Sequence, residues 1–143
     1  MRRGFTLIEL LVVVGILGVI VAIAIPLFAR YVNKAYRGTV MADVRNAVAS
    51  VEAFIGDFKN VPNTLSCPTS GYGPATCDLT DGTNTLSGAI AVSRNTRLNI
   101  EKFSCGSAES YRIHGVHALL PGWGYCFNAC TGTYTFTDGS GCP

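Results

Sequence analysis

Twenty consecutive residues near the start of the chain, Leu10 to Ala29, carry no charge, and this stretch constrains the fold more than any other feature. A helix of that length, rising about 1.5 Å per residue, spans the roughly 30 Å hydrocarbon layer of a bilayer. The core helix of a soluble protein seldom lacks a polar face over so many turns. The segment therefore predicts a helix that anchors the chain in a membrane and packs against copies of itself.

A secretory signal peptide is the main alternative for this segment, because Arg2 and Arg3 supply a positive start just before the apolar run. The run is longer than the roughly 7–15 apolar residues of such peptides. Bulky residues, Ile25 to Phe28, also stand where a cleavage site would need small ones. We therefore expect no cleavage after the segment.

All six cysteines lie beyond the apolar segment. An even number in a small exported domain predicts disulfides, each stabilising by roughly 2–4 kcal/mol, in an oxidising compartment. A metal site at Cys126 and Cys130, with His114 or His117, is the alternative, although zinc sites favour closer pairs of reduced thiols. Many connectivities exist for six cysteines, and we predict a local one: Cys67 with Cys77, Cys105 with Cys126, and Cys130 with Cys142.

Beyond Arg30 the apolar residues recur at spacings of three and four, which predicts a one-sided helix. Pro62 disfavours helix at the residue before it, so the helix should end near Asn60. We expect one continuous helix from about Phe5 to Asn60; a membrane span followed by a second helix hinged at Gly38 is the alternative. The residues expected to face a sheet or a neighbour are Met41, Val44, Val48, Val51, Ile55 and Phe58, with Asp43 on the solvent side.

The remaining residues predict a β-rich head. Residues 61–84 are dense in Pro, Gly, Thr, Ser and Asn, which is typical of an irregular loop pinned by a disulfide. The expected fold class is α+β, with the long N-terminal helix packed against a C-terminal antiparallel sheet of about four strands. Short β-like runs cover residues 88–93, 98–103, 110–116, 124–128 and 133–137.

The charge pattern gives little support for a nucleic-acid-binding surface. Eleven basic and nine acidic residues nearly balance, whereas a nucleic-acid-binding face needs clustered Lys and Arg well in excess of acids. The candidates for such a cluster are Arg94, Arg97 and Lys102.

No catalytic constellation stands out in the sequence, and we expect no enzyme activity, resident metal or cofactor. His114 and His117 would point to opposite faces of a strand. The loop from Asp138 to Gly141 could hold calcium, but one carboxylate is too few for the oxygen ligands that ion requires. Three aromatic residues are expected in the core or at a subunit interface: Trp123, Tyr125 and Phe127.

The residues Gly4-Phe5-Thr6-Leu7-Ile8-Glu9 and the apolar run after them resemble the N-terminus of type IV pilins, a family that includes the pseudopilins. The resemblance implies that a prepilin peptidase cleaves between Gly4 and Phe5 and methylates the new amine of Phe5. It implies that Glu9 attracts the Phe5 amine of a neighbouring subunit and so sets the stagger of the filament. The alternative for Glu9 is an acid that reaches the lipid headgroups.

The same resemblance implies a softened stretch of helix at Gly18 and Pro26, where pilins often unwind on assembly. Proline removes a backbone donor, and glycine has low helix propensity. A simple kink at Pro26 is the alternative.

The resemblance implies a structural subunit that waits in the inner membrane and then polymerises into an extracellular helical filament for adhesion, twitching motility or DNA uptake. Its partners would be copies of itself, the prepilin peptidase, the membrane, and the assembly platform with its ATPase motor. A minor pilin, a type II secretion pseudopilin with a ligand-binding head, and a membrane-anchored enzyme are the alternatives. The implied divisions are a leader at 1–4, a membrane and filament-core helix at 5–29, an amphipathic helix at 30–60, and a head at 61–143.

Overall fold

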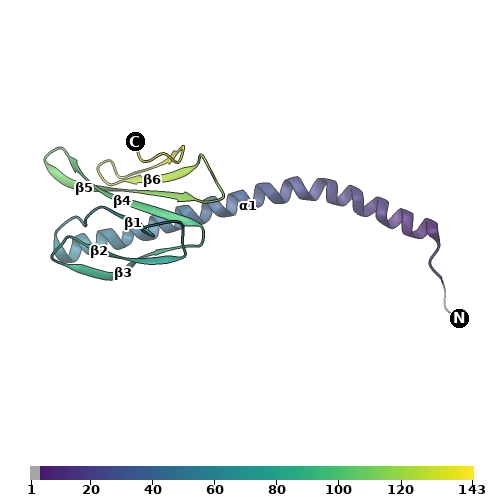
Figure 1. The fold of residues 1–143 in the computed structure, drawn as a ribbon. Helices are drawn as coiled ribbons and strands as arrows, with labels where there is room; N and C mark the ends of the chain where they lie inside the picture. Colours follow the sequence, from purple (N-terminus) through teal and green to yellow (C-terminus); the bar gives the residue numbers. More distant parts are fainter. Residues whose placement is uncertain (1–3) are drawn as a thin grey trace. The chain divides into compact units, whose positions relative to one another are not determined.

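The computed structural model describes residues 4–143, so Arg2 and Arg3 of the expected leader lie outside the described residues (Figure 1). One helix, α1, runs over Leu7–Phe58. It ends where Lys59 takes a positive φ of 60°, a left-handed conformation common just past a helix end. The continuous helix expected from Phe5 to Asn60 is confirmed to within about two residues at each end.

The chain divides into two compact units, one ending at Ala35 and the other spanning Tyr36–Pro143. Within the second unit, an antiparallel sheet of five strands has the order β1-β4-β5-β6-β7, and β2 pairs with β3 in a separate two-stranded sheet. The α+β class is confirmed. The strands are β1 (Leu65–Cys67), β2 (Ala75–Thr80), β3 (Thr85–Val92), β4 (Thr96–Cys105), β5 (Ala108–His117), β6 (Gly124–Asn128) and β7 (Thr133–Thr137).

The segment expected to be an irregular loop, 61–84, instead contains β1 and β2. The prediction was wrong because β1 has only three residues, and because residues typical of turns are dense on both sides of β2. The six residues of β2 do alternate between apolar and polar, as expected of a half-buried strand, but so short a run was read as part of the loop.

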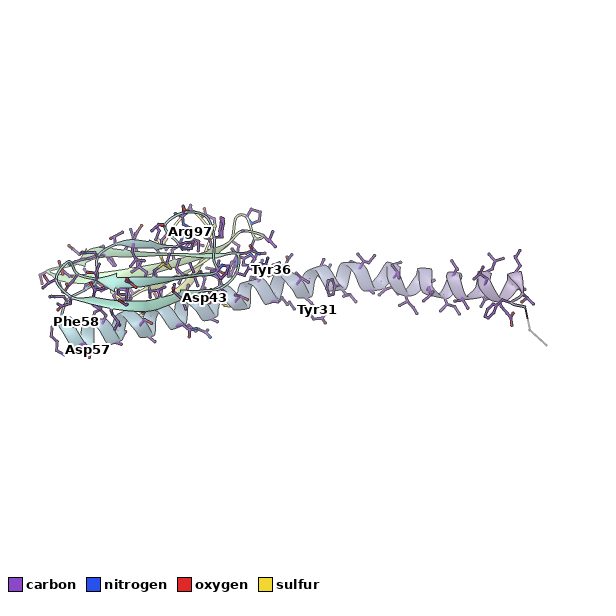
Figure 2. The ribbon with its side chains drawn as sticks, turned by 60° about the horizontal axis from the view of Figure 1, so that its bottom comes forward. Tyr31, Tyr36, Asp43, Asp57, Phe58 and Arg97 are labelled. Atoms are coloured by element: carbon purple, nitrogen blue, oxygen red, sulfur yellow. A yellow bond between two sulfur atoms is a disulfide. The ribbon has the colours of Figure 1, made fainter. Side chains whose placement is uncertain are left out.

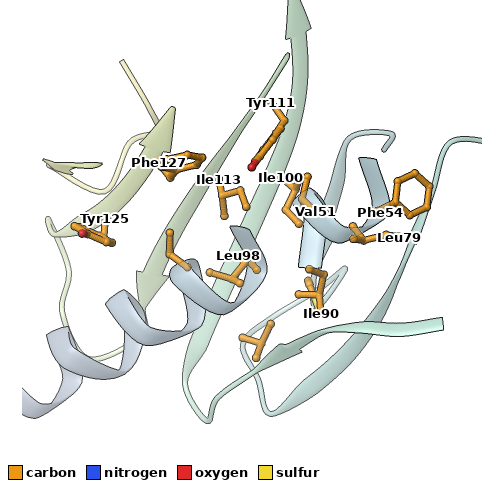
Figure 3. Close-up of a cluster of buried hydrophobic side chains, with 14 of the residues drawn as sticks. Val51, Phe54, Leu79, Ile90, Leu98, Ile100, Tyr111, Ile113, Tyr125 and Phe127 are labelled. Carbon is orange, nitrogen blue, oxygen red and sulfur yellow. The ribbon is translucent and has the colours of Figure 1, made fainter. Parts of the chain in front are cut away.

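The core of the second unit lies between α1 and the sheets (Figure 3). Four positions on the helix are fully buried: Val40, Val44, Val51 and Phe54. Val44 and Val51 belong to the expected stripe, and its other members, Met41, Val48, Ile55 and Phe58, are half-buried against the same core, so the stripe faces the sheets as predicted. They meet side chains from both sheets: Leu79, Ile90, Leu98, Ile100, Tyr111, Ile113, Tyr125 and Phe127.

Helix and sheet approach each other closely at Gly115 in β5. A Cβ placed on this residue would lie 2.7 Å from Cγ2 of Val44, 2.8 Å from Cγ1 of Val40 and 3.0 Å from Cδ2 of Leu98. Carbon atoms pack at about 3.5–4.0 Å, so no larger residue fits without displacement. The absence of a side chain here allows α1 to sit directly over β5.

Asp43 was expected on the solvent side of the helix, and this was wrong, since its side chain is buried. Its carboxylate accepts hydrogen bonds from the backbone N–H of Ser93 at 2.9 Å and from the Ser93 hydroxyl at 2.8 Å. A buried carboxylate is tolerated when donors compensate for its lost hydration. Asp43 therefore fastens the turn between β3 and β4 to the helix.

The structure contains three disulfides: Cys67–Cys77, Cys105–Cys130 and Cys126–Cys142. The first is the predicted pair, but the predicted pairs Cys105–Cys126 and Cys130–Cys142 are wrong. Strand register explains the difference. Cys126 lies opposite His114, well inside the sheet, whereas Cys130 follows β6 toward the β4–β5 turn that begins at Cys105.

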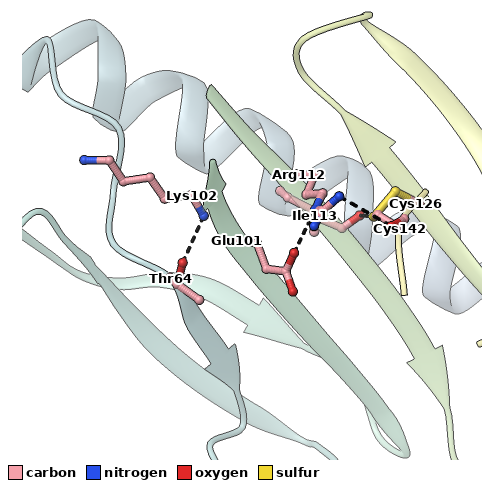
Figure 4. A network of polar contacts seen from close by, with 7 residues as sticks. All are labelled: Thr64, Glu101, Lys102, Arg112, Ile113, Cys126 and Cys142. Carbon is pink, nitrogen blue, oxygen red and sulfur yellow. Dashed lines mark hydrogen bonds and ion pairs between the residues drawn. A yellow bond between two sulfur atoms is a disulfide. The ribbon is translucent and has the colours of Figure 1, made fainter. Parts of the chain in front are cut away.

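The C-terminal segment is held against the sheet face that points away from α1 (Figure 4). Cys142 is bonded to Cys126, and its carbonyl accepts a hydrogen bond from Arg112. Arg112 also forms an ion pair with Glu101 at 2.7 Å across β4 and β5. The disulfide therefore ties the end of the chain to β6.

Candidate assembly site

The start of α1 is capped by its own side chains. The backbone N–H and the hydroxyl of Thr6 donate hydrogen bonds to Oε2 of Glu9, at 2.9 and 2.8 Å. The Thr6 hydroxyl in turn accepts a longer bond, 3.4 Å, from the Glu9 backbone N–H. This reciprocal capping box satisfies donors that a helix start otherwise leaves open. Thr6-Leu7-Ile8-Glu9 carries the T-x-x-E pattern that signals such a box in sequence.

Gly4 and Phe5 precede the helix and are exposed, with 81% of Phe5 accessible. The peptide bond at which cleavage is expected therefore lies in non-helical chain, one residue before the cap. Glu9 lies in the first turn, beside a shallow hollow whose other lining residues are Phe5, Ile8, Val12 and Val13. The residues for which processing and pairing are expected thus occupy one short stretch.

The unit that ends at Ala35 offers an apolar surface on every side of the helix. None of the side chains in its most apolar stretch is buried (Figure 2). The helix is long and apolar enough to cross a membrane. It is continuous through Gly18 and Pro26, the positions at which softening is expected. Exposed apolar surface of this extent marks contact with lipid or with other chains.

Comparison with known proteins finds the same N-terminal motif that the sequence shows. Residues 1–25 match the family model described as the prokaryotic N-terminal methylation motif. The chain is 37% identical over 59 residues to the type IV major fimbrial protein FimA of Dichelobacter nodosus, covering 41% of this chain and 38% of that protein. It is 29% identical over 104 residues to fimbrial protein Q of Moraxella bovis, covering 66% of each. These matches support a type IV pilin, a family taken to include the pseudopilins.

A third relative is similar over a shorter stretch. Over 34 residues the chain is 56% identical to the prepilin peptidase-dependent protein D of Escherichia coli K12, which covers 24% of this chain and 23% of that protein. The chain thus spans less than two thirds of the length of each of these relatives. No solved structure matches it significantly.

The two histidines of the head lie on opposite faces of β5, as expected. His114 is hydrogen-bonded to the Thr137 hydroxyl at 3.0 Å, whereas His117 stacks on the ring of Tyr36 with 4.5 Å between ring centroids. Burial lowers the pKa of both imidazoles below the ordinary value. Nδ1 of His117 accepts a hydrogen bond from the Leu119 backbone N–H, so the neutral form is the one the fold uses.

The candidate basic residues do not form a single patch. Arg97 and Lys102 stand on opposite faces of β4, and Lys102 forms an ion pair with Glu109 at 2.8 Å. In the C-terminal loop, Asp138 accepts hydrogen bonds from the backbone and side chain of Ser140, and these lower its pKa. Within residues 4–143, no group of three or more metal-ligating side chains comes together.

The three aromatic residues in and just before β6 behave as expected, since Tyr125 and Phe127 are buried in the core and Trp123 packs half-buried against it. Two contacts between helix arginines and aromatic rings were not predicted. Arg37 lies over the Trp123 ring, and Arg45 lies over Tyr134. No short motif signals such contacts, because each joins residues about 90 positions apart.

Proposed function

We propose that this chain is a structural subunit of a type IV pilus. Its precursor is held in the inner membrane by the apolar helix, cleaved between Gly4 and Phe5, methylated at Phe5, and polymerised into an extracellular filament. The observation that carries the proposal is the exposed apolar helix preceded by the methylation motif. The fimbrial relatives support the same role.

The proposed divisions of the chain follow from this role. Residues 1–4 are the leader, 5–29 the membrane and filament-core helix, 30–60 the amphipathic half of the helix, and 61–143 the head. The prepilin peptidase and the assembly platform with its motor act on the first two segments. In this role the chain is a building block without enzymatic activity.

Glu9 is the residue on which polymerisation depends in this proposal. Moving an apolar helix from lipid into a protein bundle gains little hydrophobic free energy, because both surroundings are apolar. Specificity must then come from packing and from the few polar groups present. A carboxylate in an apolar region is costly without a partner, and the amine created at Phe5 on a neighbouring subunit supplies one of opposite charge.

The capping contact with Thr6 allows a sharp test of Glu9. Glu9→Gln retains an oxygen that can accept from Thr6, since Gln also serves in capping boxes, but it removes the charge. Glu9→Ala removes both. If charge pairing drives assembly, both variants insert into the membrane yet yield few or no filaments. Filaments at the normal yield from Glu9→Gln would contradict the pairing and leave only a capping role for Glu9.

A further inference from the structure

Five residues of the second unit form an aromatic and cationic surface, here called the β7 patch: Arg37, Arg45, Trp123, Tyr134 and Phe136. The guanidinium of Arg37 lies 5.4 Å from the centre of the Trp123 ring, and that of Arg45 lies 5.9 Å from the centre of Tyr134. Trp123 and Phe136 are 6.0 Å apart between ring centroids. The patch therefore joins one flank of α1 to the last strand of the sheet.

The β7 patch is open to solvent. Phe136 is 68% exposed and Tyr134 40%, although both stand on the same sheet face as the buried Tyr125 and Phe127. The C-terminal segment, tied by Cys142 to the opposite face, leaves this one uncovered. The edge strand β7 carries neither charge nor proline, the features with which proteins usually protect an edge from pairing.

The charge of the β7 patch is positive. Among residues 36–143 no carboxylate lies within ion-pair distance of Arg37 or Arg45. Glu52 stands two turns beyond Arg45 on the same flank, but it accepts a hydrogen bond from Tyr111. Asp138, after β7, is engaged by Ser140. Neither Arg37 nor Arg45 therefore forms an ion pair within residues 36–143, and both guanidinium groups are available to a carboxylate of another chain.

A separate hairpin, beyond the end of the five-stranded sheet opposite to β7, carries negative charge. The hairpin of β2 and β3, residues 75–92 and here called the acidic hairpin, contains Asp78 and Asp81 and neither Lys nor Arg. It lies next to β1 and β4, at the other end of the sheet order from β7. Two cations flank it in the sequence: Arg94, in the turn after β3, and Lys59, next to the Asn60 whose amide donates to Asp81.

Asp78 is exposed and Asp81 is half-buried, and hydrogen bonds hold both side chains in place. Asp78 accepts a hydrogen bond from the Gly88 backbone N–H at 2.7 Å through one oxygen, Oδ1. Asp81 accepts from the backbone N–H groups of Thr83 and Asn84 and from the amide of Asn60. The backbone donor of Asn84 is the largest of the causes that hold the Asp81 pKa well below its usual range, so the residue stays charged.

We propose that the β7 patch of one subunit docks on the acidic hairpin of a second copy of this chain. The two surfaces are on different sides of the head, so the contact is head-to-tail, the kind that propagates into a helical filament. Opposite charges select the partner and its register, and the exposed aromatic rings supply apolar area. This inference rests on the filament function proposed above.

A charge swap tests the contact in cells that assemble the full chain. Arg45→Glu places like charges across the interface and should reduce sheared surface filament several-fold, with the membrane-held pool unchanged by immunoblot. Adding Asp78→Arg to Arg45→Glu should restore the filament. Asn46→Glu, which adds a negative charge at the adjacent exposed position, is the matched control and should leave the yield unchanged.

A photo-cross-linking amino acid in place of Phe136 gives an independent measurement, in which filaments should yield chain-to-chain adducts within residues 75–92. Normal filament from Arg45→Glu, no restoration in the double variant, or adducts confined to other segments would each overturn the docking contact. In all three results the wild-type chain still forms filaments, so the proposed function survives. A wild-type chain that forms no filament would reject both proposals.

Discussion

The close approach of α1 to Gly115 makes one substitution unusually informative. In Gly115→Ala the added methyl would meet Cγ2 of Val44 at 2.7 Å and Cγ1 of Val40 at 2.8 Å, well inside normal carbon contact. Both valines are fully buried and cannot swing into solvent. Overpacking of this kind destabilises by about 1–3 kcal/mol, and we expect Gly115→Ala to lower the free energy of unfolding of the head by that amount.

The measurement is urea unfolding of the full chain in detergent, followed by the fluorescence of Trp123, the single tryptophan. Gly56→Ala is the control, because Gly56 lies within α1 and an added Cβ would meet nothing within 4 Å. It should stabilise by roughly 0.5–1 kcal/mol through reduced backbone freedom in the unfolded chain. In Gly115→Ala/Val44→Ala the loss should be smaller than the sum of the single losses, by roughly 0.5–3 kcal/mol. Equal stabilities for Gly115→Ala and Gly56→Ala would refute the close packing described here.

Two further predictions concern buried polar groups of the head. Asp43→Ala removes the acceptor for the backbone N–H and hydroxyl of Ser93 and should lower the free energy of unfolding by about 1–3 kcal/mol. Asp43→Asn keeps one oxygen and should lower it by less. Equal losses in the two variants would contradict the role given to these hydrogen bonds. Burial lowers the pKa of His114 and His117 in the folded chain. Below about pH 6.5, the ordinary pKa of histidine, the unfolded chain therefore binds more protons than the folded one. The contribution of the two neutral imidazoles to stability is fully present above that pH and falls as the pH drops below it. Urea unfolding from pH 7 to pH 5 should show this decline, and His114→Gln/His117→Gln should flatten it; an unchanged slope in the double variant would contradict the assignment.

Most of the helix could be predicted from the sequence because its signals are local. The uncharged stretch and the spacing of three and four fix its extent, and Pro62 gives its end. The face that the helix buries was predicted less well. Asp43 was placed on the solvent side because its hydrogen-bond partner, Ser93, lies fifty residues away in the sequence. Burial of a polar residue depends on that distant donor.

The head was predicted only in outline, because its decisive contacts are between distant parts of the chain. The pairing of Cys130 with Cys105 follows from the register of β5 and β6, which no local pattern reveals. The first strand of the acidic hairpin, β2, was not predicted because turn-forming residues are dense on both sides of it. By contrast, the candidate assembly site rests on a short contiguous motif, and so Gly4, Phe5 and Glu9 could be named from sequence.

Intact-mass analysis of filaments sheared from the cell surface would show whether the chain is a processed filament subunit. We expect the subunit to begin at Phe5, to carry one methyl group on its new amine, and to contain three disulfides. Surface filaments that lack this chain, or contain it with residues 1–4 still attached, would contradict the proposed function.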